Sequence, residues 1–249
     1  MKGFLEVAVD SLVSARAAIA GGADRLELCS ALAIGGLTPY AELLKQIRAE
    51  SDIRIRCLMR PRGGDFLYTA EEIQMMAEQI KHLGSLGADG FVIGCLTAEG
   101  DLDCRIMEPL LEAASGKALT LHRCIDVSRD LCKTYLDAKS LGIDTVLTSG
   151  AAENCLMGMK TIGELLKLRD LHQGPEVLVG GGVKAGVISA FKDAFPQVKA
   201  FHMSGKVEVE SGMRFRREGI PMGIPGLDEW HIHQTDLNNV RAARVAADA

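Results

Sequence analysis

Short apolar runs alternate with longer amphipathic stretches along the whole chain of 249 residues. The apolar runs are rich in Val, Ile, Leu or Phe and too short for helices, which is typical of buried β-strands. Consecutive runs begin about 20–40 residues apart, the span of one β–α unit. The predicted strands are Phe4–Val9, Arg25–Cys29, Ile53–Met59, Gly90–Ile93, Ala118–His122, Thr145–Thr148, Glu176–Val179 and Ala200–Met203.

The stretches between these strands carry start and stop signals for helices. Thr69-Ala70-Glu71-Glu72 is a capping box, and Thr38-Pro39 places a cap residue before a first-turn proline. Three stretches end in glycine, one further residue and aspartate, directly before the next strand. These repeats, Gly22-Ala23-Asp24, Gly87-Ala88-Asp89 and Gly142-Ile143-Asp144, mark a recurring supersecondary unit.

Eight β–α units in about 250 residues predict a (β/α)₈ (TIM) barrel, and no linker divides residues 1–249, so we expect one domain. A doubly wound open sheet is the rival fold, but it usually carries G-x-G-x-x-G after the first strand. Here that strand runs into Asp10-Ser11-Leu12. After the eighth strand we expect an insertion over Lys206–His233 and a final helix from about Asp236 to Ala247.

Alternation along each predicted strand separates side chains that face the helices from those that face the barrel axis. Leu5 and Val7 are apolar and face the helices, so Glu6 and Ala8 face the axis. The same parity on the other strands gives the inward side chains Glu27, Cys29, Arg56, Arg60, His122 and His202.

Charged groups of this kind need partners or contact with the wet mouth of the barrel. For Glu6 and Arg56, an internal ion-pair network and a functional role both stay open. The groups nearer the C-terminal strand ends lie where such barrels carry their active sites, and we predict functional roles for them. These are Glu27, Arg60, His122 and His202.

The loop after the third strand reads Arg60-Pro61-Arg62-Gly63-Gly64-Asp65-Phe66. Two arginines and bare glycine backbone at this end of a barrel predict capture of an anion by Arg60 and Arg62, with Asp65 beside them. The alternative is a surface loop closed by an ion pair between Arg62 and Asp65.

The loops after the fifth and sixth strands carry acid–base and hydroxyl groups. In His122-Arg123-Cys124-Ile125-Asp126, we expect Asp126 to orient His122 as an acid–base catalyst. Glu27 and His122 are the candidate proton-transfer pair, and His202 is expected beside them under the reacting end of a ligand. Thr148-Ser149-Gly150 adds two hydroxyl groups that can bind a ligand.

Glycines follow the last two strands of the predicted barrel, as Gly180-Gly181-Gly182 and Ser204-Gly205. Many (β/α)₈ enzymes hold a phosphate on backbone N–H groups at these two positions. We therefore predict an anion site there; the alternative is that the three glycines only permit a tight turn.

Composition narrows the classes of function. The chain has 28 Lys and Arg residues against 33 Asp and Glu, a net charge of −5, and only 4% aromatic residues. Nucleic-acid-binding proteins need basic patches and stacking rings, so we expect no nucleic-acid partner. Glu6 interrupts the first apolar run and no run approaches the ~18 residues of a membrane span, so we expect neither a signal peptide nor a membrane partner.

Seven cysteines are scattered along the chain without a C-x-x-C pair, which argues against zinc-ribbon and thioredoxin-like sites. Free buried thiols are typical of a reducing compartment. We therefore predict a cytoplasmic protein.

The order of these motifs resembles that of the CutC family, known as copper homeostasis proteins. The resemblance covers nearly the whole chain, and its most specific part is the Arg60–Phe66 string. The matching strings are Leu5-Glu6-Val7 with Asp10-Ser11, 22–30, 35–39, 60–66, His122-Arg123 with Asp126, 146–150, 180–182, His202, 211–216 and Met222-Gly223.

The resemblance implies a cytosolic (β/α)₈ barrel that forms a dimer or, in some members, a tetramer, with a link to copper tolerance. It also implies that cysteines bind copper(I). The candidate copper ligand here is Cys29, with Cys124 or His122 as a second ligand. Animal members have a cysteine where this chain has Ala8, so the usual second thiolate beside Cys29 is missing.

Two functions stay open at this point, while a scaffold protein would leave the charged mouth unexplained. One is copper homeostasis; the other is a lyase or isomerase for a small phosphorylated or carboxylated metabolite. We also expect a homodimer, because the Lys206–His233 insertion carries apolar side chains that need cover. They are Met213, Phe215, Ile220, Met222, Ile224 and Trp230.

Overall fold

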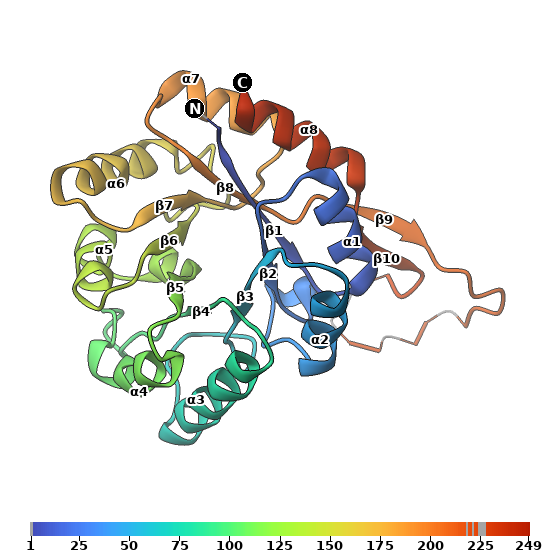
Figure 1. Ribbon diagram of the computed structural model, residues 1–249, viewed down its shortest axis with the longest axis horizontal. Helices are drawn as coiled ribbons and strands as arrows, with labels where there is room; N and C mark the ends of the chain where they lie inside the picture. The colour runs from blue at the N-terminus through green and yellow to red at the C-terminus, as the bar shows by residue number, and fades with distance from the viewer. Residues whose placement is uncertain (1, 218, 221, 224–227) are drawn as a thin grey trace.

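Eight parallel strands close into a barrel in which each strand pairs with its neighbours in chain order and β8 pairs with β1 (Figure 1). This computed structural model describes residues 2–217, 219–220, 222–223 and 228–249. The barrel strands are β1 (Phe4–Val9), β2 (Arg25–Leu28), β3 (Arg54–Leu58), β4 (Gly90–Ile93), β5 (Ala118–Leu121), β6 (Thr145–Thr148), β7 (Glu176–Val179) and β8 (Ala200–Met203).

Helices surround the barrel, and α8 closes their ring by packing between α7 and α1 (Figure 1). This arrangement confirms the predicted (β/α)₈ barrel. No helix among the described residues is long and apolar enough to cross a membrane. The helices are α1 (Leu12–Gly21), α2 (Ala41–Glu50), α3 (Ala70–Ser85), α4 (Cys104–Ala114), α5 (Leu131–Ser140), α6 (Met159–His172), α7 (Ala185–Ala194) and α8 (Leu237–Asp248), with short 3₁₀ turns η1 (Leu32–Ile34) and η2 (Arg123–Val127).

The repeated Gly-x-Asp pattern joins three of the even strands, β2, β4 and β6, to the strand before each. The glycine adopts positive φ after the helix, and the aspartate carboxylate accepts a hydrogen bond from a backbone N–H near the start of the preceding strand. The pairs are Asp24 with Leu5 at 2.8 Å, Asp89 with Ile55 at 2.7 Å and Asp144 with Leu119 at 2.6 Å.

The expected caps hold at one helix and fail at another. Thr69 and Glu72 form the predicted capping box of α3. Helix α2, in contrast, begins at Ala41 after Tyr40, so Thr38 does not cap it. Thr38 instead exchanges hydrogen bonds with the backbone of Arg60, because its hydroxyl both accepts from the Arg60 N–H and donates to the Arg60 carbonyl.

The predicted strand parity is correct, and charged side chains occupy part of the barrel interior. Leu5 and Val7 are fully buried in the core between strands and helices, whereas Glu6 pairs in register with Arg25 and His202 of the flanking strands. Glu6 binds Arg25 through a 2.5 Å contact. Arg56 does not bind Glu6 and lies 2.6 Å from Asp144, so the barrel contains two separate ion pairs.

After β8 the chain forms an antiparallel hairpin of β9 (Lys206–Glu210) and β10 (His231–Thr235), which projects from the barrel in Figure 1. This hairpin occupies the predicted insertion, and α8 follows as the predicted final helix. Val209 and Ile232 face each other across the hairpin and are exposed, as are Met213 and Phe215 beyond it. Ile224 lies outside the described residues.

Candidate functional site

A cavity of about 480 Å³ opens at the C-terminal ends of the barrel strands. Its walls come from most strands of the barrel or from the residues that follow them, so distant parts of the sequence meet around one space. Residues contributed in this way are Ala8, Glu27, Leu58, His122, Leu147, Gly181 and His202. Active sites of (β/α)₈ enzymes lie at this face, which makes the cavity the candidate site.

About half of the side chains predicted from the sequence line this cavity. They are Glu27, Arg60, His122, Asp126, Gly181, Gly182, His202 and Ser204. The other predicted residues lie outside its lining, although Gly205 lines a neighbouring cavity that shares Ser204 and Lys206 with it. Those outside are Cys29, Arg62, Asp65, Thr148, Ser149, Gly180 and Gly205.

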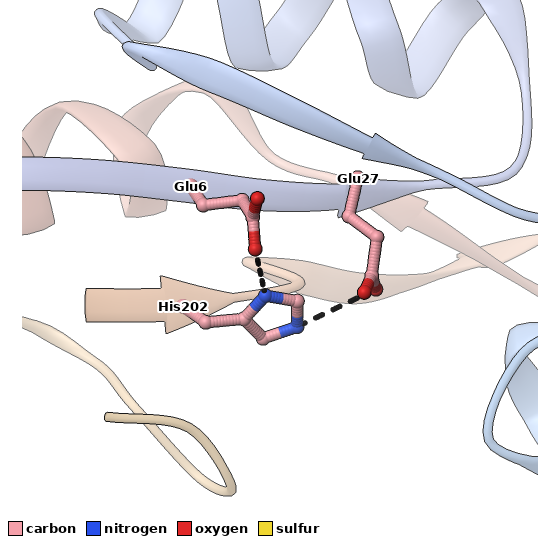
Figure 2. Close-up of side chains that lie close together, drawn as sticks. All are labelled: Glu6, Glu27 and His202. Carbon is pink, nitrogen blue, oxygen red and sulfur yellow. Dashed lines mark hydrogen bonds and ion pairs between the residues drawn. The ribbon is translucent and has the colours of Figure 1, made fainter. Parts of the chain in front are cut away.

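His202 lies between two glutamates, Glu6 and Glu27 (Figure 2), and of the three Glu27 and His202 line the cavity. His202 Nδ1 lies 2.8 Å from Glu6 Oε1, and His202 Nε2 lies 3.8 Å from Glu27 Oε2. Arg25 binds the other oxygen of Glu6. Glu6 is therefore fully engaged below the cavity, whereas Glu27 belongs to the cavity wall.

The environment separates the pKa values of the two carboxyl groups. Burial alone would raise the pKa of Glu6, but the Arg25 charge and the hydrogen bond to His202 lower it to about 2. Burial raises the pKa of Glu27 to about 7, against the opposing effect of His202. For His202 the two carboxylates outweigh burial and raise the pKa. Carboxyl groups separated in this way are typical of acid–base sites.

Glu6, Glu27 and His202 are also the one group of three or more potential metal ligands close enough to share an ion within the described part of the chain. They offer two carboxylates and an imidazole, which suit hard or borderline divalent ions. Copper(I) prefers thiolates, so this donor set does not fit it.

The Cys29 thiol is completely buried and donates to the Val9 carbonyl at 3.4 Å. Burial raises the pKa of Cys29 well above its usual value, and a metal binds the thiolate. Ala8 lines the cavity nearby and provides no second sulfur. All seven cysteines are free thiols.

The expectation that Asp126 orients His122 is wrong. His122 Nδ1 accepts a hydrogen bond from the backbone N–H of Cys124 at 3.2 Å. Asp126 instead accepts from the Thr148 hydroxyl at 2.5 Å and the Ser149 backbone at 2.9 Å, and pairs with Arg123 at 2.7 Å. Thr148 and Ser149 thus bind Asp126, and the three residues fix the loop after β6 beside the cavity.

The two predicted anion-binding arginines serve different purposes. Arg60 lines the cavity, and its guanidinium donates to backbone carbonyls of Ile34, Gly36 and Gly64, so it joins two loops at the mouth. Arg62 points away and pairs with Glu72 and Asp65, which is the alternative that the sequence left open.

The glycines after β7 expose backbone to the cavity. Gly181 and Gly182 have φ of +90° and +79°, a conformation that favours glycine. Among the described residues, neither amide N–H finds an acceptor. Ser204 also lines the cavity, so unpaired backbone N–H groups and a residue with a hydroxyl group belong to the same wall.

Three basic residues of the site were not predicted. Arg25 has the same strand parity as Glu27, so the inward position was readable from the sequence. Lys206 follows Ser204-Gly205 and lines the cavity, and Arg123 enters it from η2. No periodicity marks Arg123, because it lies in a turn.

Comparisons with known proteins agree with one another. The model of the CutC family matches residues 4–207. A family protein CutC of Chromobacterium violaceum is 39% identical over 249 residues, covering 100% of this chain and 99% of its own; one from Parabacteroides distasonis is 39% identical over 245, covering 97% and 99%. The crystal structure of a Streptococcus agalactiae protein, named as a copper homeostasis protein CutC, superposes with a TM-score of 0.76 at 30% identity, covering 81% of this chain and 98% of that one.

Proposed function

This chain belongs to the CutC family, and we propose that it is an enzyme that moves a proton on a small anionic metabolite at the barrel mouth. The observation that carries the proposal is the arrangement of Glu27 against His202, which Glu6 holds from below. A carboxyl group with a pKa of about 7 both accepts and releases a proton near neutral pH.

Glu27 is the residue to which we assign the proton transfer. Ionised Glu6 accepts from Nδ1–H of His202, which orients Nε2 toward Glu27. The carboxylates raise the pKa of His202, and the protonated imidazolium stabilises the Glu27 carboxylate before it takes a proton from the substrate and after it returns that proton. Removing a proton from one atom and returning it to another is the chemistry of an isomerase, or of a lyase when a bond breaks in between.

Positive charge around the cavity supports an anionic substrate. Arg60, Arg123 and Lys206 line it, and Lys206 makes no ion pair with any described residue. The unpaired amides of Gly181 and Gly182 fit the oxygens of a phosphate or carboxylate group. We propose that one end of the substrate binds there while the other end reaches Glu27.

Deuterium uptake from solvent tests the proposal across a panel of candidate substrates. Small sugar phosphates and 2-oxo acids are incubated with the protein in deuterated water and followed by NMR. We expect carbon-bound deuterium in at least one compound, slowed about 10²–10⁴-fold in Glu27→Gln. Glu153→Gln, at an exposed carboxyl group, is the matched control. The proposal fails if no compound exchanges and native mass spectrometry of the purified protein finds no retained anion.

Family membership supports a second candidate, a role in copper homeostasis, since that is the name of the Streptococcus agalactiae relative. It would require copper(I) binding at Cys29, with Cys124 or His122 as a partner. Metal analysis of the purified protein tests it directly: copper bound in stoichiometric amount would favour this role over the enzyme. We also propose a cytoplasmic location, which the seven free thiols support.

A further inference from the structure

His122 follows β5 and enters the cavity wall from the start of η2. Its Nδ1 accepts a hydrogen bond from the backbone N–H of Cys124 at 3.2 Å. A ring nitrogen that accepts carries no proton, so the proton of the neutral ring is on Nε2. The backbone of η2 therefore fixes the tautomer.

The opposite nitrogen of this ring has no partner. His122 is 5% exposed, and its buried Nε2 meets no acceptor among the described residues. Phe66 packs against the ring with centroids 4.7 Å apart. Gly94 adjoins the Nδ1 edge so closely that a Cβ there would lie 2.7 Å from Cε1. Gly94 and the Cys124 N–H thus occupy the Cε1 and Nδ1 side of the ring, and a buried donor without a partner indicates a water, an ion or a ligand as its partner.

The His122 ring also does not take up a proton near neutral pH, as an acid–base catalyst would. Burial, followed by the positive charge of Arg60, lowers the pKa of His122 to about 3. A histidine that transfers protons works best with a pKa near the pH of the reaction. His122 therefore stays neutral while Glu27 and His202 titrate, and the sequence-based assignment of His122 as an acid–base group does not fit its surroundings.

We propose that His122 binds an oxygen of the substrate through Nε2–H and acts as a neutral hydrogen-bond donor, an inference that rests on the proposed function of the cavity. The fitting chemical class is a carbonyl or carboxylate next to the carbon from which Glu27 takes the proton. A fixed donor at that oxygen stabilises the negative charge that develops when the proton leaves. The substrate would then carry an anionic group for the glycines and a carbonyl or carboxylate oxygen for His122.

The tautomer is the first test and needs no substrate. In ¹⁵N-labelled protein, the His122 signal is assigned through its contacts with the Phe66 ring protons. We expect a neutral Nε2–H form from pH 5 to pH 8. A titration of this ring within that range, or a proton on Nδ1, would overturn the proposal.

The second test uses phosphoglycolate, which carries a phosphate at one end and a carboxylate at the other. Its binding should shift the Nε2–H proton, whereas inorganic phosphate, which fills only the glycine end, should leave it unchanged. His122→Gln keeps an amide donor near the place of Nε2, and His122→Asn does not. We expect phosphoglycolate affinity to fall by about tenfold or more in Asn and much less in Gln. Equal losses in both variants, or no shift of the proton, would refute the donor role.

These readouts separate this inference from the proposed function. If binding depends on His122 but no carbon acid exchanges deuterium, the proposed enzyme activity is wrong and the donor role of His122 stands. Exchange that depends on Glu27 but is unaffected by His122→Asn would do the reverse.

Discussion

Replacing Glu27 by Gln should stabilise the folded protein at alkaline pH while it slows proton transfer. Glu27 has a pKa of about 7 in the fold against an ordinary value of 4.5. A raised carboxyl pKa favours folding in full below pH 4.5, and this contribution is lost as the pH rises through 7. Gln cannot ionise, so the variant does not suffer the loss.

The size of the effect follows from the two pKa values. Their difference corresponds to about 3 kcal/mol of unfolding free energy at pH 8 and to less than about 1 kcal/mol at pH 5. The substitution also removes the partner of His202, whose raised pKa stabilises the wild type at acid pH. Both effects favour the variant more at pH 8 than at pH 5, by about 2 kcal/mol or more.

Urea unfolding followed by circular dichroism at pH 5 and pH 8 measures this difference. Any change in packing contributes equally at both pH values and cancels. Glu153→Gln, at an exposed position, controls for the loss of one carboxylate from the chain. An equal loss of stability at both pH values would mean that Glu27 is ionised and paired in the fold, and the assigned proton transfer would lose its basis.

Three further outcomes test the rest of the site and the assembly. Gly181→Val should lower the affinity for inorganic phosphate, measured by calorimetry, about tenfold or more. The new Cβ would lie 2.9 Å from the Ser149 Cβ, and the φ of +90° disfavours valine. Unchanged affinity would mean that these glycines serve only the turn. Cys29→Ser should not change copper(I) binding in competition with a chelator, since the thiol is completely buried with a raised pKa and position 8 is alanine; a tight one-to-one site lost in the variant would contradict this. We also propose a homodimer covering the exposed apolar residues of the β9–β10 hairpin, such as Val209 and Ile232. Light scattering should then give about twice the 26.7 kDa chain mass, and a monomer at micromolar concentration would refute the dimer.

The fold was predictable because its determinants are local and repeated. Each strand is short and its helix-facing positions are apolar, and the Gly-x-Asp pattern that precedes three even strands has a direct role in the structure, as the aspartate accepts from the preceding strand. Strand ends are less well determined: the pattern places His122 in the fifth strand, whereas in the structure β5 ends at Leu121 and His122 is the N-cap of η2. The strand pattern therefore determines the order and parity of the barrel, and less of the loops.

Strand parity predicted the interior residues of the site, and glycine-rich loops predicted part of its rim, but the pairing of side chains in the loops was not predictable. Glu27, Arg60 and His202 reach the cavity as expected. Asp126 lies four residues after His122, close enough in sequence to suggest a pair, yet η2 turns the carboxylate toward Ser149. The path of such a loop depends on contacts with the neighbouring strand, and no local pattern encodes them.

Charge balance explains which interior groups support the fold and which are available for chemistry. The pair of Glu6 with Arg25 is internally compensated, and Arg56 with Asp144 forms a second pair below it, where Asp144 also receives the N–H of Leu119. Breaking the Glu6–Arg25 pair would leave a buried charge without a partner, at a cost of about 3–5 kcal/mol, whereas the Asp144 side chain is 44% exposed and water screens its pair with Arg56. Glu27 and His202 differ from these pairs because they are not in direct hydrogen-bond contact and both line the cavity.

Glu27 and His202 lie 3.8 Å apart, beyond direct hydrogen-bond distance, and both line the cavity. A proton can move between Glu27 and His202 without breaking an ion pair of the fold, because Glu6 contacts His202 Nδ1 whether the proton is on Glu27 or on His202. Glu6→Gln should therefore destabilise the protein at neutral pH, by about 3 kcal/mol, while Glu27→Gln stabilises it at pH 8. Opposite signs for two glutamates on adjacent strands, measured by the same urea unfolding, would separate the structural carboxylate from the reactive one, and equal signs would contradict that separation.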